Sequence, residues 1–141
     1  MAWVVDTCLL LDIGLDDPKF AEKTERLLRA RSRDGLVICP ITFVELAPAF
    51  GGDTKAPGEF LLNLGIESRE DWTWADTAKA ATSWAHYVRK RRAKQIAKRP
   101  VADVLIGSFA SRFQGLLTRN RADFTDIFPQ LSIIEPVHGG S

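Results

Sequence analysis

The chain has 141 residues, of which 45% are hydrophobic and 26% are charged, and its formal net charge is +1. These values are typical of a folded globular protein and argue against a globally disordered chain. A net charge this small neither requires nor excludes a polyanionic partner.

The first half of the chain alternates short apolar runs with helical patterns. Residues 2–5 form an apolar run that stops at Asp6, which is typical of a strand buried on both faces. Asp17-Pro18 predicts a helix start, because aspartate is a good N-cap and proline suits the first helical position. The elements expected here are a strand over 2–5, a helix over 7–15, a helix from 18 to 34, a strand over 36–39 and a helix over 42–50.

The second half continues this alternation. The expected elements are a helix over 59–64, a weak strand at 66, a long helix over 74–97, a helix over 101–113, a strand over 116–118, a loop over 119–122 and a strand over 131–134. Strands that alternate with helices imply a mostly parallel sheet. We therefore expect one α/β domain over residues 1–136, with a central sheet of four to five strands flanked by helices, and a flexible tail over 137–141.

Cysteine use and the apolar runs indicate the compartment. Cys8 and Cys39 lack metal-ligand spacing, and two cysteines make a disulfide framework improbable. The first apolar run reaches Asp6 too soon for a signal peptide. No apolar run approaches the roughly 20 residues that span a bilayer. We expect a cytoplasmic protein with no membrane association, whose cysteines are buried apolar residues.

Four acidic residues are placed to meet at one edge of the expected sheet. Asp6 ends the first strand, Glu45 lies one helical turn after the second, and Asp103 opens the helix before the 116–118 strand. Asp123 follows that strand. Ligands of such sheets bind beyond the carboxyl ends of the strands. Unit charges 4 Å apart repel by about 4 kcal/mol at an effective dielectric near 20, so converging carboxylates predict a divalent cation. All-oxygen ligation suits Mg²⁺, with Mn²⁺ as a substitute.

Each acid also has a purely structural interpretation. Asp6 can cap the helix that follows it, and Thr42-x-x-Glu45 matches a capping box. Asp103 is favourable at a helix N-terminus through the helix dipole. Asp123 can cap a short helix over 124–128. Asp126 is an alternative to Asp123 as the fourth acid, because the sequence does not fix the geometry of this loop.

Four segments, each containing one of these acids, occur in a distinctive order. They are Val5–Asp12, Pro40–Leu46, Asp103–Ala110 and Leu117–Phe124. Together they resemble the motifs of PIN-domain ribonucleases, and the length and layout are most similar to VapC-type toxins of bacterial toxin–antitoxin pairs. Cys8 and Gly107 stand where other residues are common in that family, but neither removes a carboxylate.

The resemblance implies a single PIN-like domain that acts as an Mg²⁺-dependent endoribonuclease on tRNA or rRNA. It implies that Asp6, Glu45, Asp103 and Asp123 hold one or two metal ions. Asp6 and Asp103 are the expected direct ligands, and Glu45 either ligates or accepts a proton from the attacking water. Thr7, Thr118 and Asn120 are expected to orient these carboxylates or waters. The family also implies a homodimer and a cognate antitoxin that covers the acidic groove.

A carboxylate-rich site that binds RNA also needs cations at its rim. Basic residues concentrate late in the 74–97 helix and after the 116–118 strand. The candidates for RNA contact are Arg89, Lys90, Arg91, Arg92, Lys94, Lys98, Arg99, Arg119 and Arg121. The alternative is a solvated helix end, where cations are favourable without any ligand.

Other functions and residues receive weaker support. A receiver domain would need a late lysine, and a phosphatase with an aspartate nucleophile would need a second aspartate where Cys8 stands. The remaining alternatives are an RNA-processing nuclease outside a toxin–antitoxin system and a non-catalytic RNA- or protein-binding module. Packing is the expected role of Trp3, Trp72, Trp74 and Trp84, and Asp12, Asp16 and Asp17 are expected at helix ends on the surface.

Overall fold

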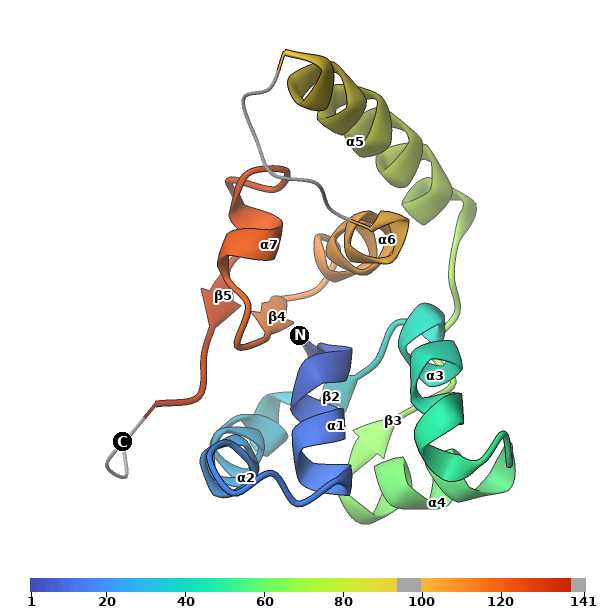
Figure 1. Cartoon of the computed structure of the whole chain (residues 1–141), viewed down its shortest axis with the longest axis vertical. Helices are drawn as coiled ribbons and strands as arrows, with labels where there is room; N and C mark the ends of the chain where they lie inside the picture. Colours follow the sequence, from blue (N-terminus) through green and yellow to red (C-terminus); the bar gives the residue numbers. More distant parts are fainter. Residues whose placement is uncertain (94–99, 138–141) are drawn as a thin grey trace.

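A parallel sheet runs through the centre of the molecule (Figure 1). The computed structural model describes residues 1–93 and 100–137, and within them five strands form one sheet in the order β3-β2-β1-β4-β5. All neighbouring strands pair in parallel. The strands are β1 (Trp3–Val5), β2 (Leu36–Val37), β3 (Ile66–Glu67), β4 (Gly115–Leu117) and β5 (Ile133–Ile134). The α/β class and the parallel sheet flanked by helices, both expected from the sequence, are confirmed.

Strand β1 lies at the centre because every one of its residues is apolar and buried. Successive side chains of a strand point to opposite faces of the sheet. Val4 accordingly packs with Val37 and Leu116 in one core cluster, whereas Trp3 and Val5 belong to the other. A continuous apolar run at this position therefore fills two cores at once, which an alternating strand would not do.

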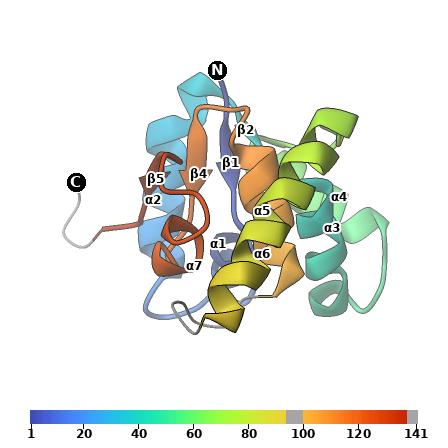
Figure 2. The same ribbon diagram turned by 90° about the horizontal axis from the view of Figure 1, so that it is seen from above.

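Helices cover both faces of the sheet, so the molecule has three layers (Figures 1 and 2). On the Val4 face, the core includes residues of α5, α6 and α7, and on the Val5 face it includes residues of α1, α2, α3 and α4. Helix α3 also packs against both α1 and α6. The helices are α1 (Thr7–Gly14), α2 (Ala21–Arg31), α3 (Pro40–Leu46), α4 (Lys55–Asn63), α5 (Trp74–Arg92), α6 (Val101–Ala110) and α7 (Ala122–Thr125).

Several element boundaries differ from those expected. The helix expected from Pro18 begins only at Ala21, because the Asp17 side chain accepts the backbone N–H groups of Lys19 and Phe20 and so closes a separate turn. Strand β2 ends at Val37, two residues early. The loop expected over 119–122 leads directly into α7. Residues 94–97 of the expected long helix and residues 138–141 of the expected tail lie outside the described residues.

None of the helices in the described ranges is long and apolar enough to cross a membrane.

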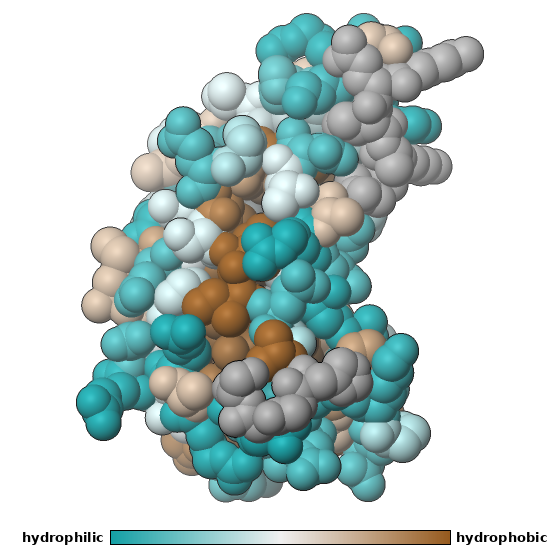
Figure 3. Space-filling view, turned by 90° about the vertical axis from the view of Figure 1, so that its left-hand side faces the viewer, coloured by the Kyte–Doolittle hydropathy of each residue, from teal (hydrophilic) through white to brown (hydrophobic). Residues whose placement is uncertain are grey.

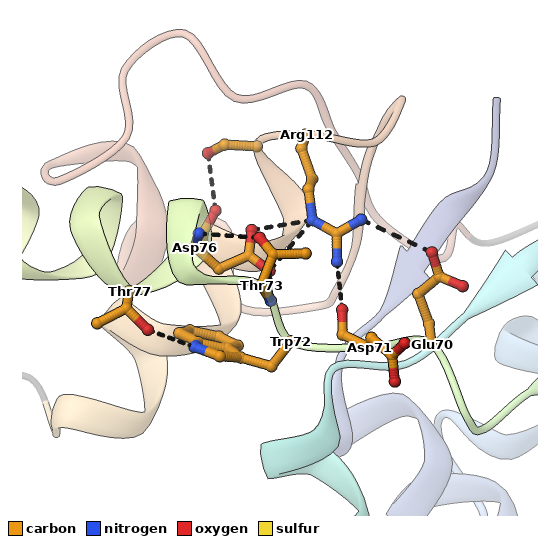
Figure 4. A network of polar contacts seen from close by, with 9 residues as sticks. Glu70, Asp71, Trp72, Thr73, Asp76, Thr77 and Arg112 are labelled. Atoms are coloured by element: carbon orange, nitrogen blue, oxygen red, sulfur yellow. Dashed lines mark hydrogen bonds and ion pairs between the residues drawn. The ribbon is translucent and has the colours of Figure 1, made fainter.

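A polar network joins the start of α5 to the end of α6 (Figure 4). Arg112 donates from Nε to both carboxylate oxygens of Asp76, at 2.9 and 3.1 Å, and its Nη2 donates to the backbone carbonyl of Asp71. Asp76 also forms a capping box with Thr73. The buried Asp76 charge is thus paired and fully hydrogen-bonded, as an interior carboxylate requires. This network attaches the segment before α5 and the first turn of α5 to Arg112, just after α6.

A close approach at Gly107 provides a test of the core beneath α6. A Cβ at this position would lie 2.2 Å from the Phe128 ring. We expect Gly107→Ala to lower the free energy of unfolding by about 1–3 kcal/mol, the usual cost of overpacking. The matched control is Gly58→Ala in α4, where a Cβ meets nothing within 4 Å and should stabilise the helix by about 0.5–1 kcal/mol. Equal effects of the two substitutions in urea unfolding would contradict this packing.

Candidate carboxylate site

Asp6 lies where the central strand β1 ends, and its side chain is bound on both oxygens. Its Oδ1 accepts the backbone N–H of Thr7 at 2.8 Å, and its Oδ2 accepts the Thr118 hydroxyl at 2.7 Å. Asp6 is therefore the N-cap of α1, as the structural interpretation expected. The bond from Thr118 crosses from the end of β4, so the two central strands meet at this carboxylate.

Glu45 reaches the same place from α3. The Thr7 hydroxyl donates to Glu45 Oε1 at 2.6 Å, and the Thr42 hydroxyl lies 3.0 Å from that of Thr7. The capping-box interpretation of Thr42 and Glu45 is wrong, because α3 begins at Pro40 and Thr42 is a buried residue inside it. Thr7 thus contacts Glu45 with its side chain and Asp6 with its backbone, which supports its expected role as an orienting residue.

The Asp6 carboxyl group is in an unfavourable electrostatic environment. Only 6% of Asp6 is exposed, and burial raises its pKa above the ordinary value, with a smaller contribution from the nearby charge of Glu45. The hydrogen bonds from Thr118, Thr7 and Cys8 act in the opposite direction. Among the described residues, all of its hydrogen-bond donors are neutral groups. Within this part of the chain, the negative charge of Asp6 is stabilised by dipoles and not by a cation.

The other two expected acids lie on neighbouring elements. Asp103 lies in the first turn of α6, and Asp123 in the first turn of α7, so Asp123 does not cap that helix. Helix α6 packs against both α3 and α7. In residues 1–93 and 100–137, however, no three His, Cys, Asp or Glu side chains are gathered closely enough to hold a metal ion. The structure therefore brings Asp6 and Glu45 together through Thr7, and it places Asp103 and Asp123 on the neighbouring helices α6 and α7.

The pair formed by Asp6 and Glu45 fits a hard divalent cation in charge and in donor type. Both supply carboxylate oxygen, the ligand that Mg²⁺ and Mn²⁺ prefer. A cation here would offset the burial and the mutual repulsion that raise the pKa of Asp6. The buried carboxylate without a cationic partner in the described chain is thus the observation on which a metal site depends.

The cysteines near this site are unsuited to nucleophilic chemistry. Cys8 Sγ lies 3.5 Å from both Asp6 Oδ2 and Thr118 Oγ1. Burial raises the pKa of Cys8 and that of Cys39 to about 12, so both thiols stay protonated at neutral pH. Cys39 is buried, as expected, whereas Cys8 is only partly buried and contacts polar atoms.

Two arginines expected to contact RNA are engaged within the protein. Arg119 forms a bidentate ion pair with Asp12. Arg121 forms an ion pair with Glu135 at 3.0 Å and also donates to the Ile133 carbonyl. The expectation that Asp12 is a surface carboxylate is wrong, because it is buried beneath Arg119. No feature of the local sequence pattern around Asp12 indicates this partner, which lies 107 residues away.

The remaining basic candidates lie on α5. The strands point toward the end of the molecule where α1 begins and where the last turns of α5 lie (Figure 2). Lys90 Nζ donates to the Asp126 carbonyl at 3.2 Å, which places this end of α5 beside the segment after α7. Arg89, Arg91 and Arg92 belong to the same turns, whereas Lys94, Lys98 and Arg99 lie outside the described residues.

The four tryptophans occupy different environments, and Trp84 is 38% exposed with its ring 5.1 Å from that of Tyr87. Trp3 is buried, and Trp72 stacks on Phe109 and donates to the Thr77 hydroxyl, so both have the expected packing role. Trp74 is 81% exposed at the start of α5. No packing role follows for Trp74 within the described chain.

Comparison with known proteins adds no family assignment. No protein-family model matches the sequence, and no curated protein matches it.

The raised pKa of Asp6 predicts a pH-dependent gain of stability in Asp6→Asn. A carboxyl group whose pKa is higher in the folded than in the unfolded protein destabilises the fold when it is ionised, and this penalty disappears as the pH falls toward the unfolded value near 4. Asparagine keeps the N-cap but carries no charge. We expect Asp6→Asn to be more stable than the wild type in urea at pH 7, with a smaller difference at pH 4.

The control is Asp53→Asn, in which an exposed carboxylate that accepts backbone N–H groups is replaced by an amide. This variant should show little change at either pH. An Asp6→Asn protein that is less stable than the wild type at pH 7 would show that ionised Asp6 stabilises the fold.

Proposed function

We propose that this protein is a divalent-metal-dependent endoribonuclease of the PIN type. The proposal depends on one observation: a buried carboxylate at the end of the central strand, with neutral hydrogen-bond donors and a second carboxylate beside it. Structural acids in protein interiors are normally paired with a cation, as Asp76 is with Arg112. Within residues 1–93 and 100–137, Asp6 has only neutral hydrogen-bond donors, and a buried carboxylate of this kind at the edge where parallel sheets bind ligands favours a functional site.

In this proposal Asp6 and Glu45 form the core of the metal site, and Asp103 and Asp123 complete it from α6 and α7. The bound ion would polarise the phosphodiester and lower the pKa of a water molecule. Thr118 and the Thr7 backbone fix the direction of the Asp6 carboxylate, and the Thr7 hydroxyl fixes that of Glu45. Glu45 is exposed, which supports a role in accepting a proton from the attacking water.

RNA would approach along the edge between α1 and the end of α5. Arg89, Lys90, Arg91 and Arg92 follow one another in the last turn of α5, near the carboxyl ends of the strands (Figure 2). Phosphate contacts from such residues supply affinity without sequence preference. Arg119 and Arg121 are weaker candidates for RNA contact, because their guanidinium groups form ion pairs within the protein.

The carboxylates are tested by Asp6→Asn and Asp103→Asn. We expect each variant to lose RNA cleavage while keeping the wild-type circular dichroism spectrum. Thr118→Val should lower cleavage by about 10- to 100-fold, because an orienting hydrogen bond is removed and the ligand remains. New RNA ends mapped after expression in a bacterial host provide the measurement. Full activity in both aspartate variants would refute the assignment.

Metal dependence is tested by chelation. We expect EDTA to abolish cleavage by the purified wild type, and Mg²⁺ or Mn²⁺ to restore it, because the donors are all carboxylate oxygens. Ca²⁺ at the same concentration serves as the matched control, since it carries the same charge but has a larger radius and a looser geometry. Undiminished cleavage in EDTA would exclude a metal-dependent mechanism.

We further propose, from the sequence resemblance, that the nuclease is the toxin of a toxin–antitoxin pair and acts as a homodimer. Two apolar surface features support partner binding. A cavity of about 780 Å³ lies between α3, α4 and β3, with Phe43, Leu62 and Ile66 in its lining, and Leu62 is 75% exposed. A band of apolar side chains also crosses the face seen from the β5 side (Figure 3). Such surfaces are typical of interaction sites.

The toxin role makes a separate prediction about growth. Induction of the wild type in a bacterial host should arrest growth, and co-expression of the gene directly upstream should relieve the arrest. The Asp103→Asn variant should leave growth unaffected. RNA cleavage without growth arrest would favour an RNA-processing nuclease.

A further inference from the structure

A partly buried ion pair joins the loop after β4 to helix α1. Arg119 Nε donates to Asp12 Oδ2 at 2.7 Å, and Arg119 Nη2 donates to Asp12 Oδ1 at 3.2 Å. The Asp12 side chain is 6% exposed and that of Arg119 is 33% exposed. Bidentate pairing of this kind fixes the orientation of the guanidinium group as well as its position.

A third element holds the same guanidinium group. Cζ of Arg119 lies 4.5 Å from the centroid of the Phe20 ring. Phe20 belongs to the turn that precedes α2. Arg119 is thus held between α1 and the start of α2, with one face on an aromatic ring and one edge on a buried carboxylate. This geometry is that of a structural anchor and differs from that of a side chain extended toward a ligand.

The residues on either side of Arg119 connect this anchor to the carboxylate site. Thr118 donates its hydroxyl to Asp6 Oδ2, and the same hydroxyl oxygen accepts the backbone N–H of Asn120 at 3.1 Å. Residues 118, 119 and 120 therefore each make a defined contact. Both acids in these contacts, Asp6 and Asp12, belong to the single segment formed by β1 and α1.

We propose that the ion pair of Asp12 with Arg119 positions the loop of residues 118–120 and thereby holds the Thr118 hydroxyl on Asp6. Arg119 is then a positioning residue of the carboxylate site and not an RNA contact. The kinetic part of this inference rests on the proposed nuclease function, whereas its structural part does not. Without the anchor, the loop loses its attachment to α1, and the carboxylate loses the neutral donor that orients it.

The structural part is tested by hydrogen exchange in the full-length protein without RNA. We expect Arg119→Gln to raise the exchange rate of the Asn120 amide at least tenfold, because that amide bonds to the Thr118 hydroxyl. Arg119→Lys should be intermediate, since it keeps the charge but loses the two-pronged bond. Arg119→Gln alone removes the partner of the buried Asp12 carboxylate and is therefore expected to destabilise the fold. The double variant Asp12→Asn/Arg119→Gln removes both charges, and its thermal melting serves as the control for folding. An Asn120 exchange rate that is unchanged in both Arg119→Gln and Asp12→Asn/Arg119→Gln would overturn the proposal.

The second test separates positioning from RNA contact. With a fluorescein-labelled single-stranded RNA as substrate, we expect Arg119→Gln to lower kcat by about 10- to 100-fold and to change KM less than twofold. Affinity for the same RNA is measured in Asp103→Asn protein, with and without Arg119→Gln. We expect the dependence of this affinity on salt concentration to be the same in the two proteins. The matched control Arg89→Gln should reduce the salt slope by about one, as expected for loss of a phosphate contact. A reduced slope with unchanged kcat in Arg119→Gln would make Arg119 an RNA contact and overturn the proposal.

Failure of the wild type to cleave this RNA would count against the nuclease function, and the exchange test would still decide the role of the ion pair.

Discussion

The hydrogen bond from the Thr118 hydroxyl to the Asp6 carboxylate connects the ends of the two strands at the centre of the sheet. Strand pairing of β1 with β4 brings Val5 opposite Leu117, so the residues that follow them are adjacent at the edge. In this register Val4 and Val5 lie in the cores on opposite faces of the sheet. The position of the carboxylate is thus a direct consequence of how the core is packed.

A buried carboxylate without a cationic partner lowers the stability of the fold that holds it. The protein offsets part of this cost with the Thr7 N–H, the Thr118 hydroxyl and the position of Asp6 as the N-cap of α1. The same chain shows a different solution twice, in the ion pairs of Asp12 with Arg119 and Asp76 with Arg112. In the described part of the chain, Asp12 and Asp76 are paired with arginines and Asp6 is bound only by neutral donors, which supports the view that Asp6 is reserved for a ligand. Proteins commonly trade stability for activity in this way.

Much of this arrangement was predictable from local patterns in the sequence. The apolar runs that end at Asp6 and at Thr118 are short-range features, and they place Asp6, Thr7 and Thr118 correctly at one edge of the sheet. The partners of Asp12 and Asp76 were not predictable, because ion pairs between residues 107 and 36 positions apart leave no periodic signal. Thr42 and Glu45 match a capping box by spacing alone, but Pro40 begins the helix two residues earlier and turns Thr42 into the core. The distance between Asp103 and the Asp6–Glu45 pair depends on how α6 packs, which no local pattern specifies.

The shared cation is the claim that can be measured most directly. Titration of the purified protein with Mn²⁺, with the free ion followed by electron paramagnetic resonance, reports binding without any assumption about the RNA. We expect saturable binding to the wild type that is strongly weakened in Asp6→Asn and in Glu45→Gln but unchanged in Asp53→Asn. Binding of equal strength in the wild type and in Asp6→Asn, or no saturable binding at all, would contradict a metal site at the end of the central strand.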